Sequence, residues 1–319
     1  MPWVGTRTQL VLTMLSTPCP IAAGEQLGNN ESMKTPQESV PVPTRRQFLK
    51  LSGAAALACA AAPAVAREPR SAAGRGGKTL NLSVASYTFR AFNLDKTIEL
   101  TKRAGLKNIC LKSFHLPLDA KPDELAATAA KVAAAGLTLY GGGVIEMANE
   151  KQVLQAFEYG KAAGLRLLVA SPDHKMLPLI ETQVKKYDIA VAIHNHGPGD
   201  RRFPTPMSVY EKITSLDRRI GLCIDIGHTV RAGADLVESV NRCHDRLLEM
   251  HAKDVTEATA KGHCIQFGRG VIDVVGLIRA LLNVGYQGMF SYEYEADEKD
   301  PLPGLCECVG YTKGALAAL

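Results

Sequence analysis

The sequence predicts a (β/α)8 barrel, the TIM-barrel arrangement of the α/β class. Short apolar segments alternate with helical segments from residue 80 to the C-terminus, and the alternation supplies about eight strands. The apolar segments do not alternate with polar residues, which is typical of strands buried on both faces of a parallel sheet. The chain of 319 residues is 46% hydrophobic and 22% charged, the composition of an ordinary globular protein.

The eight expected strands are short and each follows a helical stretch. They are expected at residues 82–86, 108–111, 137–140, 165–170, 189–193, 220–224, 247–250 and 289–292. Strands of four to six residues separated by helices of about ten residues fit the repeating unit of a parallel barrel.

Glycines mark the ends of four of the expected helices. Each stands just before an apolar strand, and the first three are roughly 30 residues apart, the length of one helix-plus-strand unit; these glycines are Gly105, Gly136, Gly164 and Gly285. Glycine tolerates the left-handed conformation that commonly ends a helix.

Helix starts and faces are also visible in the sequence. Pro122 with Asp123 and Glu124 predicts a first helical turn, where a missing N–H costs nothing and the helix dipole favours acids. One apolar helical face is expected from the spacing of Val271, Val274, Val275, Ile278, Leu281 and Leu282.

A doubly wound open sheet is the alternative architecture. That fold would call for a glycine-rich phosphate-binding turn after the first strand, and the residues there, Ser86-Tyr87-Thr88-Phe89, are not one. The sequence therefore favours the barrel.

Residues 1–66 are interpreted as a leader, residues 67–79 as a linker and residues 80–319 as the barrel. Within the leader, residues 44–66 have the features of a signal peptide: a basic start, an Ala-rich stretch and the small-x-small site Ala64-Val65-Ala66. The pair Arg45-Arg46 followed by Phe48 and Leu49 resembles the twin-arginine type, which implies export to the periplasm of an already folded protein.

The composition argues against binding to nucleic acid and against a membrane-spanning segment. The net charge of +5 is small and no dense Lys/Arg stripe occurs, so no nucleic-acid partner is expected. No apolar run reaches the roughly 18–20 residues needed to span a bilayer. The sequence does not decide whether the protein forms a homo-oligomer.

Six cysteines follow the leader, and their spacing matches no zinc ribbon. We interpret them as small buried residues. An oxidising compartment would also allow one disulfide.

Polar residues follow the expected strands, at the end of a barrel where active sites are built. The candidates for chemistry or substrate contact are Lys112, His115, Glu146, Asp173, His174, His194, His196, Asp225, His228, His251, Lys253, Asp254, Glu293 and Glu295. Imidazoles and carboxylates together are ligands for Zn, Mn, Co or Fe. We therefore expect one divalent metal ion, held by His194, Asp225, His251 and Glu293 from the last four strands, with His196 kept as an alternative to His194.

Each residue also has a structural interpretation when taken alone. His228 could cap a helix, His251 could be a core histidine, and Glu293 could pair with Lys253 in an ion pair. The occurrence of such residues at four successive strand ends favours a site.

Four motifs together resemble the xylose-isomerase-like barrel family, which includes sugar isomerases, ketose 3-epimerases, inosose dehydratases and endonuclease-IV-type enzymes. The motifs are Cys223-Ile224-Asp225-Ile226-Gly227-His228, His251-Ala252-Lys253-Asp254, Gly268-Arg269-Gly270-Val271-Ile272-Asp273, and Gly285-Tyr286-Gln287-Gly288 leading to Tyr292-Glu293. The resemblance implies one divalent ion held by Glu, Asp, His and Glu from the last four strands. Asp225, His251 and Glu293 match the last three, and His228 matches a substrate-contacting histidine.

The fifth strand departs from that pattern. Relatives have Glu where this chain has His194. In ketose epimerases that Glu and the eighth-strand Glu act on opposite faces of the substrate carbon. A neutral imidazole can ligate a metal or act as a base, but it cannot reproduce a symmetric carboxylate pair.

The expected function is that of a metal-dependent sugar or keto-sugar isomerase or epimerase, which abstracts a proton alpha to a carbonyl through a metal-stabilised enediolate. The expected catalytic residues are Glu293, His194, Lys112 and Lys253, and the expected substrate-binding residues are His228, His196, His115 and His174.

Two other functions are weighed against it. One is a metal-dependent lyase or dehydratase acting on a 3-keto-glycoside or related keto-sugar, for which Lys112, His196 or Lys253 would be the acid. The other is a non-catalytic sugar-binding barrel, against which the retention of three metal-ligand residues argues.

Overall fold

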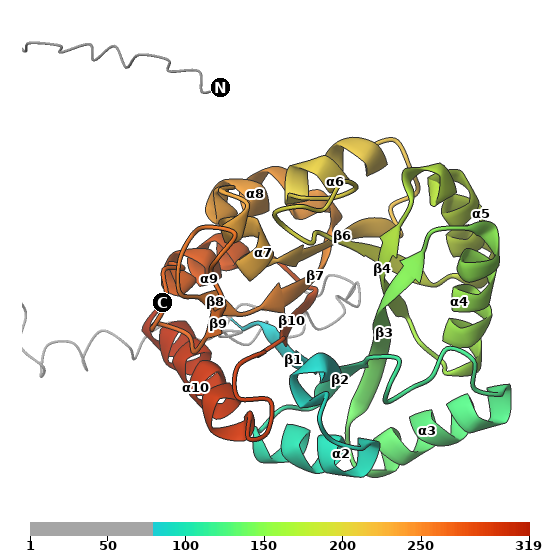
Figure 1. Cartoon of the computed structure of the whole chain (residues 1–319), viewed down its shortest axis with the longest axis horizontal. Coiled ribbons are helices and arrows are strands. Elements are labelled where there is room, and N and C mark those ends of the chain that lie inside the picture. Colours follow the sequence, from blue (N-terminus) through green and yellow to red (C-terminus); the bar gives the residue numbers. More distant parts are fainter. Residues whose placement is uncertain (1–78) are drawn as a thin grey trace, which may run out of the picture. The chain divides into compact units, whose positions relative to one another are not determined.

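The computed structural model describes residues 79–319, which form a closed parallel barrel with helices around it (Figure 1). The predicted leader, residues 1–66, and all but the last residue of the linker lie outside the described residues. The signal peptide, the twin-arginine motif and the periplasmic location therefore stay predictions.

Strands and helices alternate along the chain. The strands of the barrel are β1 (Asn81–Ala85), β2 (Asn108–Leu111), β3 (Thr138–Met147), β4 (Leu167–Pro172), β5 (Ala190–His194), β6 (Ile220–Asp225), β7 (Leu247–Ala252) and β10 (Met289–Tyr292). The helices are α2 (Leu94–Arg103), α3 (Pro122–Ala134), α4 (Glu150–Ala162), α5 (Leu177–Tyr187), α6 (Pro206–Ile213), α7 (Ile226–Arg231), α8 (Leu236–Cys243), α9 (Val274–Asn283) and α10 (Leu302–Ala318). A two-stranded antiparallel hairpin, β8 (Asp254–Val255) and β9 (Cys264–Ile265), follows β7.

The strands pair in the order β1-β10-β7-β6-β5-β4-β3-β2 and close on themselves, with every neighbouring pair in the barrel parallel. The predicted barrel is confirmed, and the open-sheet alternative is wrong for this chain. Each of the eight expected strands overlaps an observed one.

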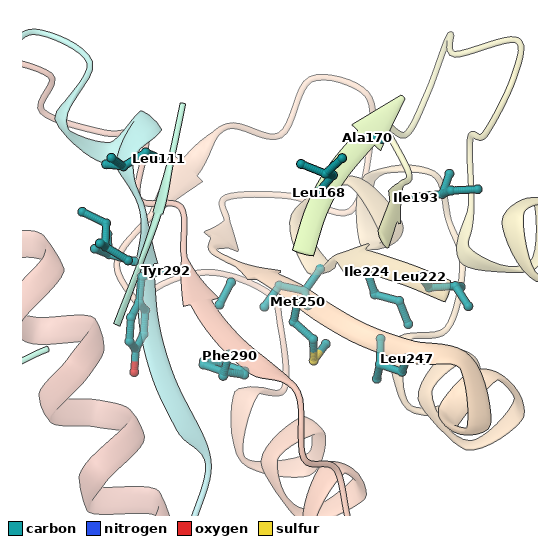
Figure 2. Packing of buried hydrophobic residues seen from close by; sticks show 14 of the residues in the cluster. Leu111, Leu168, Ala170, Ile193, Leu222, Ile224, Leu247, Met250, Phe290 and Tyr292 are labelled. Carbon is teal, nitrogen blue, oxygen red and sulfur yellow. The ribbon is translucent and has the colours of Figure 1, made fainter. Parts of the chain in front are cut away.

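One hydrophobic cluster lies between the barrel strands and the surrounding helices, and a second lies inside the lumen of the barrel. On β4, Leu168 and Ala170 belong to a large cluster that also contains helix residues, whereas Leu167 and Val169 belong to a small cluster of strand residues. Because successive side chains on a strand point to opposite faces, the second pair faces the lumen. Figure 2 shows part of the larger cluster, including Ile224 and Met250.

Helix ends agree with the glycine prediction. The backbone φ is positive at all four expected positions, between 66° and 79°, as the left-handed cap requires; they are Gly105, Gly136, Gly164 and Gly285. The predicted apolar face of α9 begins too early, since the helix starts at Val274 and Val271 is 52% exposed.

The predicted end of the third strand is also wrong. β3 runs on to Met147, so Glu146 lies within a strand and not after one. Three successive glycines, Gly141-Gly142-Gly143, are more typical of a loop than of a strand interior. In the fold they allow close packing of β3 on β4, because a Cβ at Gly143 would lie 2.1 Å from the Val169 carbonyl oxygen.

Two of the motifs meet at a buried carboxylate. The side chain of Asp254 accepts hydrogen bonds from four backbone N–H groups, those of Val255, Gly268, Gly270 and Ile272, at 2.8 to 3.1 Å. A Cβ at Gly270 would lie 2.3 Å from Asp254 Oδ1, which explains the glycine. Asp254 therefore ties the end of β7 to the loop that leads into α9.

Among the described residues, no helix is long and apolar enough to cross a membrane. The six cysteines expected to be small buried residues are all free thiols in this part of the chain, and four of them are buried.

Candidate metal centre

The four predicted metal ligands meet at the C-terminal end of the barrel. His194 ends β5, Asp225 ends β6, His251 lies near the end of β7, and Glu293 directly follows β10. One ligand atom from each lies within 4.8 Å of those of the others, and all four side chains are buried. Strand parity places His194 and Asp225 in the lumen, because each lies two residues after a lumen residue, Ala192 on β5 and Cys223 on β6.

The geometry fits a divalent ion. His194 Nε2 lies 3.4 Å from Asp225 Oδ2, and His251 Nδ1 lies 3.2 Å from Glu293 Oε2. Both ring nitrogens of His194 and of His251 are buried without a hydrogen-bond partner. Buried polar atoms are nearly always hydrogen-bonded. Buried ring nitrogens without a partner, lying beside two carboxylates, are therefore the arrangement expected of ligands for a metal ion.

Lys253 supplies a positive charge to the same carboxylates. Its Nζ lies 2.9 Å from Asp225 Oδ2 and 2.7 Å from Glu293 Oε2, and it also pairs with Glu295. Burial opposes the charged form, but the three carboxylates raise the pKa of Lys253 well above its usual range. Gly227 leaves room for this side chain, because a Cβ there would lie 2.7 Å from Lys253 Cγ.

The carboxylates are ionised in this environment. Burial opposes ionisation, but the Lys253 ammonium and the nearby His228 hold the pKa of Asp225 well below its usual range. The pKa of Glu293 is likewise held well below its usual range by His251 and Lys253 in spite of burial. Both groups can therefore donate to a metal without first losing a proton.

The two histidines differ in their electrostatics. Burial lowers the pKa of His194 to about 3, which leaves a neutral imidazole with a lone pair for a ligand. Burial also acts against charge on His251, but the negative charge of Glu293 outweighs it and raises that pKa.

Asp225 is positioned by the turn into α7. Its Oδ1 accepts the backbone N–H of His228 at 2.7 Å as the helix cap, which leaves Oδ2 for the site. Its own N–H donates to Asn195 Oδ1 at 3.0 Å, and Asn195 Nδ2 donates to Thr229 Oγ1. Asn195 therefore holds the ligand strand and the first turn of α7 together.

Two hollows open beside the four ligands. One is bordered by His228 and Lys253, together with Cys264 and Glu295. The other is bordered by Lys112 and His196, together with Glu146, Asp200 and Arg202.

Four of the predicted catalytic and substrate residues line these hollows: His228 and Lys253 line one, and Lys112 and His196 line the other. The His194 ring centroid lies 4.5 Å from that of His196 and 5.8 Å from that of His228. Lys112 is half-buried, its Nζ donates to the Val144 carbonyl at 3.3 Å, and burial lowers its pKa.

His115 and His174 have other partners. His115 Nδ1 bonds Ser86 Oγ at 2.9 Å, and its Nε2 lies within 3.0 Å of Thr97 Oγ1 and the Phe92 carbonyl. Both of its ring nitrogens are thus taken up by the protein, which leaves none for the predicted contact with substrate. His174 Nε2 bonds the Arg202 carbonyl at 3.0 Å, so this histidine supports the loop that carries Arg202.

Some residues of the site region were not singled out in the sequence. Glu249 is buried two residues before His251, accepts a hydrogen bond from Tyr140 Oη at 2.7 Å, and has its pKa raised by burial to about 8. Arg202 pairs with Glu146 and donates to the Ser171 carbonyl. Glu249 could have been noticed in the sequence, because it is a charged residue inside an otherwise apolar strand. Arg202 lies in a loop, where no sequence pattern marks it as part of the site.

Comparison with known proteins finds a family match within this barrel. Residues 174–308 match the family described as Xylose isomerase-like TIM barrel. The closed eight-stranded parallel barrel is the architecture that this family description names. Among curated proteins, no sequence match is found.

Solved structures of the same fold carry several activities. IolI, with a bound zinc atom, has 18% identity and a TM-score of 0.64 over 75% of this chain and 99% of its own. The 3-keto-D-glucoside 4-epimerase YcjR from E. coli has 17% identity and a TM-score of 0.60 over 74% of this chain and 100% of its own. AsbF from Bacillus anthracis is described as the probable 3-DHS dehydratase involved in petrobactin synthesis. It has 12% identity and a TM-score of 0.60 over 73% of this chain and 99% of its own.

Proposed function

We propose that this protein is a metal-dependent isomerase or epimerase that acts on a sugar or keto-sugar. The observation that carries the proposal is the meeting of His194, Asp225, His251 and Glu293 at the C-terminal end of the barrel, with unpaired ring nitrogens and ionised carboxylates. The zinc atom in IolI and the epimerase activity named for YcjR support it.

The four ligand side chains would hold one Mn, Zn, Co or Fe ion. When bound, such an ion acts as a Lewis acid on a carbonyl oxygen of the substrate. Two carboxylates and two imidazoles suit a borderline divalent ion.

The protein itself supplies the proton acceptors. Glu293 is a carboxylate because its pKa is held low, so it can accept a proton from the carbon alpha to a carbonyl. His194 is neutral, and an imidazole in that state can also accept one. Lys253 contacts the Glu293 carboxylate and orients it.

The flanking hollows would hold the sugar. Lys112 and His196 border one of them, and His228 borders the other. Hydroxyl groups of a sugar need such donors and acceptors for orientation.

The test is incubation of the metal-loaded protein with a 3-keto-glucoside in deuterated water. An epimer or isomer that carries solvent deuterium at the carbon alpha to the carbonyl is the expected product. Turnover that depends on the metal, but leaves that carbon free of deuterium, would contradict proton abstraction.

A lyase or dehydratase acting on a keto-glycoside is the second candidate. His194 stands where the resemblance implies a Glu, so the site lacks a symmetric carboxylate pair, and elimination does not need one. Lys112 and His196 share one hollow and could supply the acid. The dehydratase name of AsbF supports this alternative, and release of aglycone in the same incubation would establish it.

We also propose export through the twin-arginine pathway to the periplasm, on the strength of Arg45-Arg46 and the small-x-small site that ends at Ala66. The test is fractionation of cells that express the full chain, with Arg45 and Arg46 both changed to Lys as the matched variant. Accumulation of the mature protein in the periplasm only with the native pair is the expected result.

A further inference from the structure

A cysteine lies directly beneath the proposed metal ligands. Cys223 precedes Asp225 by two residues on β6, so the two side chains share the lumen face of the strand. In the barrel register Cys223 pairs with His194 of β5. It is fully buried and is a free thiol.

This thiol shares two histidines with the upper ligands. One ligand atom each from His194, Cys223 and His251 lies within 4.8 Å of the other two, a second grouping beside that of His194, Asp225, His251 and Glu293. No ring nitrogen of either histidine has a hydrogen-bond partner, so each ring can serve either grouping.

The two groupings differ in charge and in the softness of their ligands. The upper oxygens, Asp225 Oδ2 and Glu293 Oε2, already contact the Lys253 ammonium at 2.9 and 2.7 Å, so an ion there must compete with a resident cation. The Cys223 sulfur is not part of that ion pair. Thiolate and imidazole favour soft or borderline ions, whereas carboxylates suit hard ions such as Mn²⁺.

We propose that His194, Cys223 and His251 form a second, sulfur-containing coordination position for thiophilic divalent ions such as Zn²⁺, Co²⁺ and Cd²⁺, below the carboxylate position. On binding, the S–H bond of Cys223 breaks, a metal–sulfur bond forms and one proton is released to the solvent. Because both positions use the same histidines, one ion occupies one of them at a time. This inference rests on the proposed metal dependence and specifies which ions the site selects.

Burial and the charges of Glu249 and Asp225 raise the pKa of the Cys223 thiol well above its usual range. A coordinated metal removes the proton from a thiol outright, so this shift costs affinity but does not prevent coordination.

The experiment loads the chelator-treated protein with Co²⁺ and records its absorption. A sulfur-to-cobalt charge-transfer band in the near ultraviolet is expected, together with visible bands of four-coordinate cobalt. Cys223→Ser and Cys223→Ala should each lose the charge-transfer band while still binding cobalt. Cys110→Ser is the matched control, because Cys110 is buried in the same lumen cluster but belongs to neither ligand grouping of the described residues.

A competition between Zn²⁺ and Mn²⁺ measures the selectivity. Cys223→Ala should reduce the preference for Zn²⁺ over Mn²⁺ by roughly tenfold or more, as expected for the loss of one coordinating ligand. Binding of Mn²⁺ itself should change little, since the carboxylates remain.

Three outcomes are decisive. Stoichiometric cobalt without the charge-transfer band in the wild type overturns the sulfur position and leaves the proposed function intact. A band that persists in both Cys223 variants also overturns it. Failure of any divalent ion to bind, shown by metal analysis of the same samples, overturns both the sulfur position and the proposed function.

Discussion

Lys253 is the residue on which the charge balance of the site depends. It is 5% exposed and contacts two proposed metal ligands and Glu295. Removing one partner of a buried ion pair leaves an uncompensated charge, which costs far more than the loss of a surface pair. Lys253 therefore balances charge in the metal-free protein and competes with a metal for the same oxygens.

Lys253→Met should lower the free energy of unfolding of the chelator-treated protein by about 3–5 kcal/mol, because Asp225 and Glu293 lose their counter-ion. Addition of Mn²⁺ should recover more stability in the variant than in the wild type. Urea unfolding with and without metal measures both effects. Lys96→Met is the control, since Lys96 pairs with Glu99 at the surface and such a pair contributes about 0–1 kcal/mol. A Lys253 variant as stable as the wild type without metal would contradict the charge balance described here.

His194→Glu restores the carboxylate that the family resemblance implies. The variant should retain metal, bind Mn²⁺ roughly tenfold more tightly because a third carboxylate faces the ion, and show altered activity. His194→Gln keeps the site neutral there and serves as the control. Calorimetric titration of the chelator-treated proteins with Mn²⁺ checks the affinity, and loss of metal binding in the Glu variant would show that the imidazole is required.

The four ligand candidates were predictable from the sequence because each stands at the end of a recognisable strand. Lys253 was predicted as a catalytic residue or as an ion-pair partner of Glu293, and Cys223 only as a small buried residue within a motif. Their contacts depend on which side chains share the lumen after the barrel closes. Nothing in residues 110–115 distinguishes His115, which bonds Ser86 and Thr97, from a residue that faces substrate.

At the scale of elements, the loop after β7 depends on Asp254. Its carboxylate accepts four backbone N–H groups from two segments, and it is fully buried. Asp254 therefore joins the end of the His-Ala-Lys-Asp motif to the Gly-Arg-Gly segment near the site, whereas His251 and Lys253 of the same motif belong to the site itself.

Asp254→Asn should lower the free energy of unfolding by about 2–4 kcal/mol, because an amide nitrogen would face backbone donors that lose their acceptor. Asp273→Asn is the matched control: Asp273 is an exposed cap of α9, and Asn caps helices about as well. Urea unfolding of both variants checks the difference. Equal stability of the two variants would mean that the four hydrogen bonds contribute little.

His115 links the segment after β1 to the start of α2. Burial lowers its pKa below the ordinary value of 6.5, so the unfolded chain takes up a proton at a higher pH than the folded chain does. Its stabilising contribution is therefore present above pH 6.5 and is lost as the pH falls below that value.

The chelator-treated wild type should lose stability relative to His115→Gln between pH 7.5 and pH 5.5, by at most about 1.4 kcal/mol for each pH unit below 6.5. Glutamine keeps a donor and an acceptor at this position but does not titrate. Urea unfolding of both proteins at the two pH values gives the comparison. A stability difference that is the same at both values would contradict a buried neutral histidine.

The strands and helix caps were predictable because apolar runs and glycines report directly on burial and backbone conformation. The length of β3 was not, since its glycines are explained by close neighbours elsewhere in the fold, such as the Val169 carbonyl beside Gly143. The start of α9 was also misplaced, because Val271 continues the apolar spacing but lies in the loop fixed by Asp254.

At the scale of the whole molecule, closure of the barrel assembles the site. The ligands come from residues 194 to 293, and β7 pairs with both β6 and β10, which brings Asp225 and Glu293 to either side of His251. Local sequence cannot place these residues together, whereas a barrel of fixed strand order does so necessarily. A single ion would connect β5, β6, β7 and β10 at one end of the lumen.

The most direct test is an anomalous-scattering map of crystals of the protein loaded with Mn²⁺ or Zn²⁺, collected at the absorption edge of the metal. One strong peak, within bonding distance of His251 and of the carboxylate of Asp225 or the sulfur of Cys223, is the predicted result. A map without a peak in the lumen, from crystals of protein that retains activity after chelation, would contradict the metal centre.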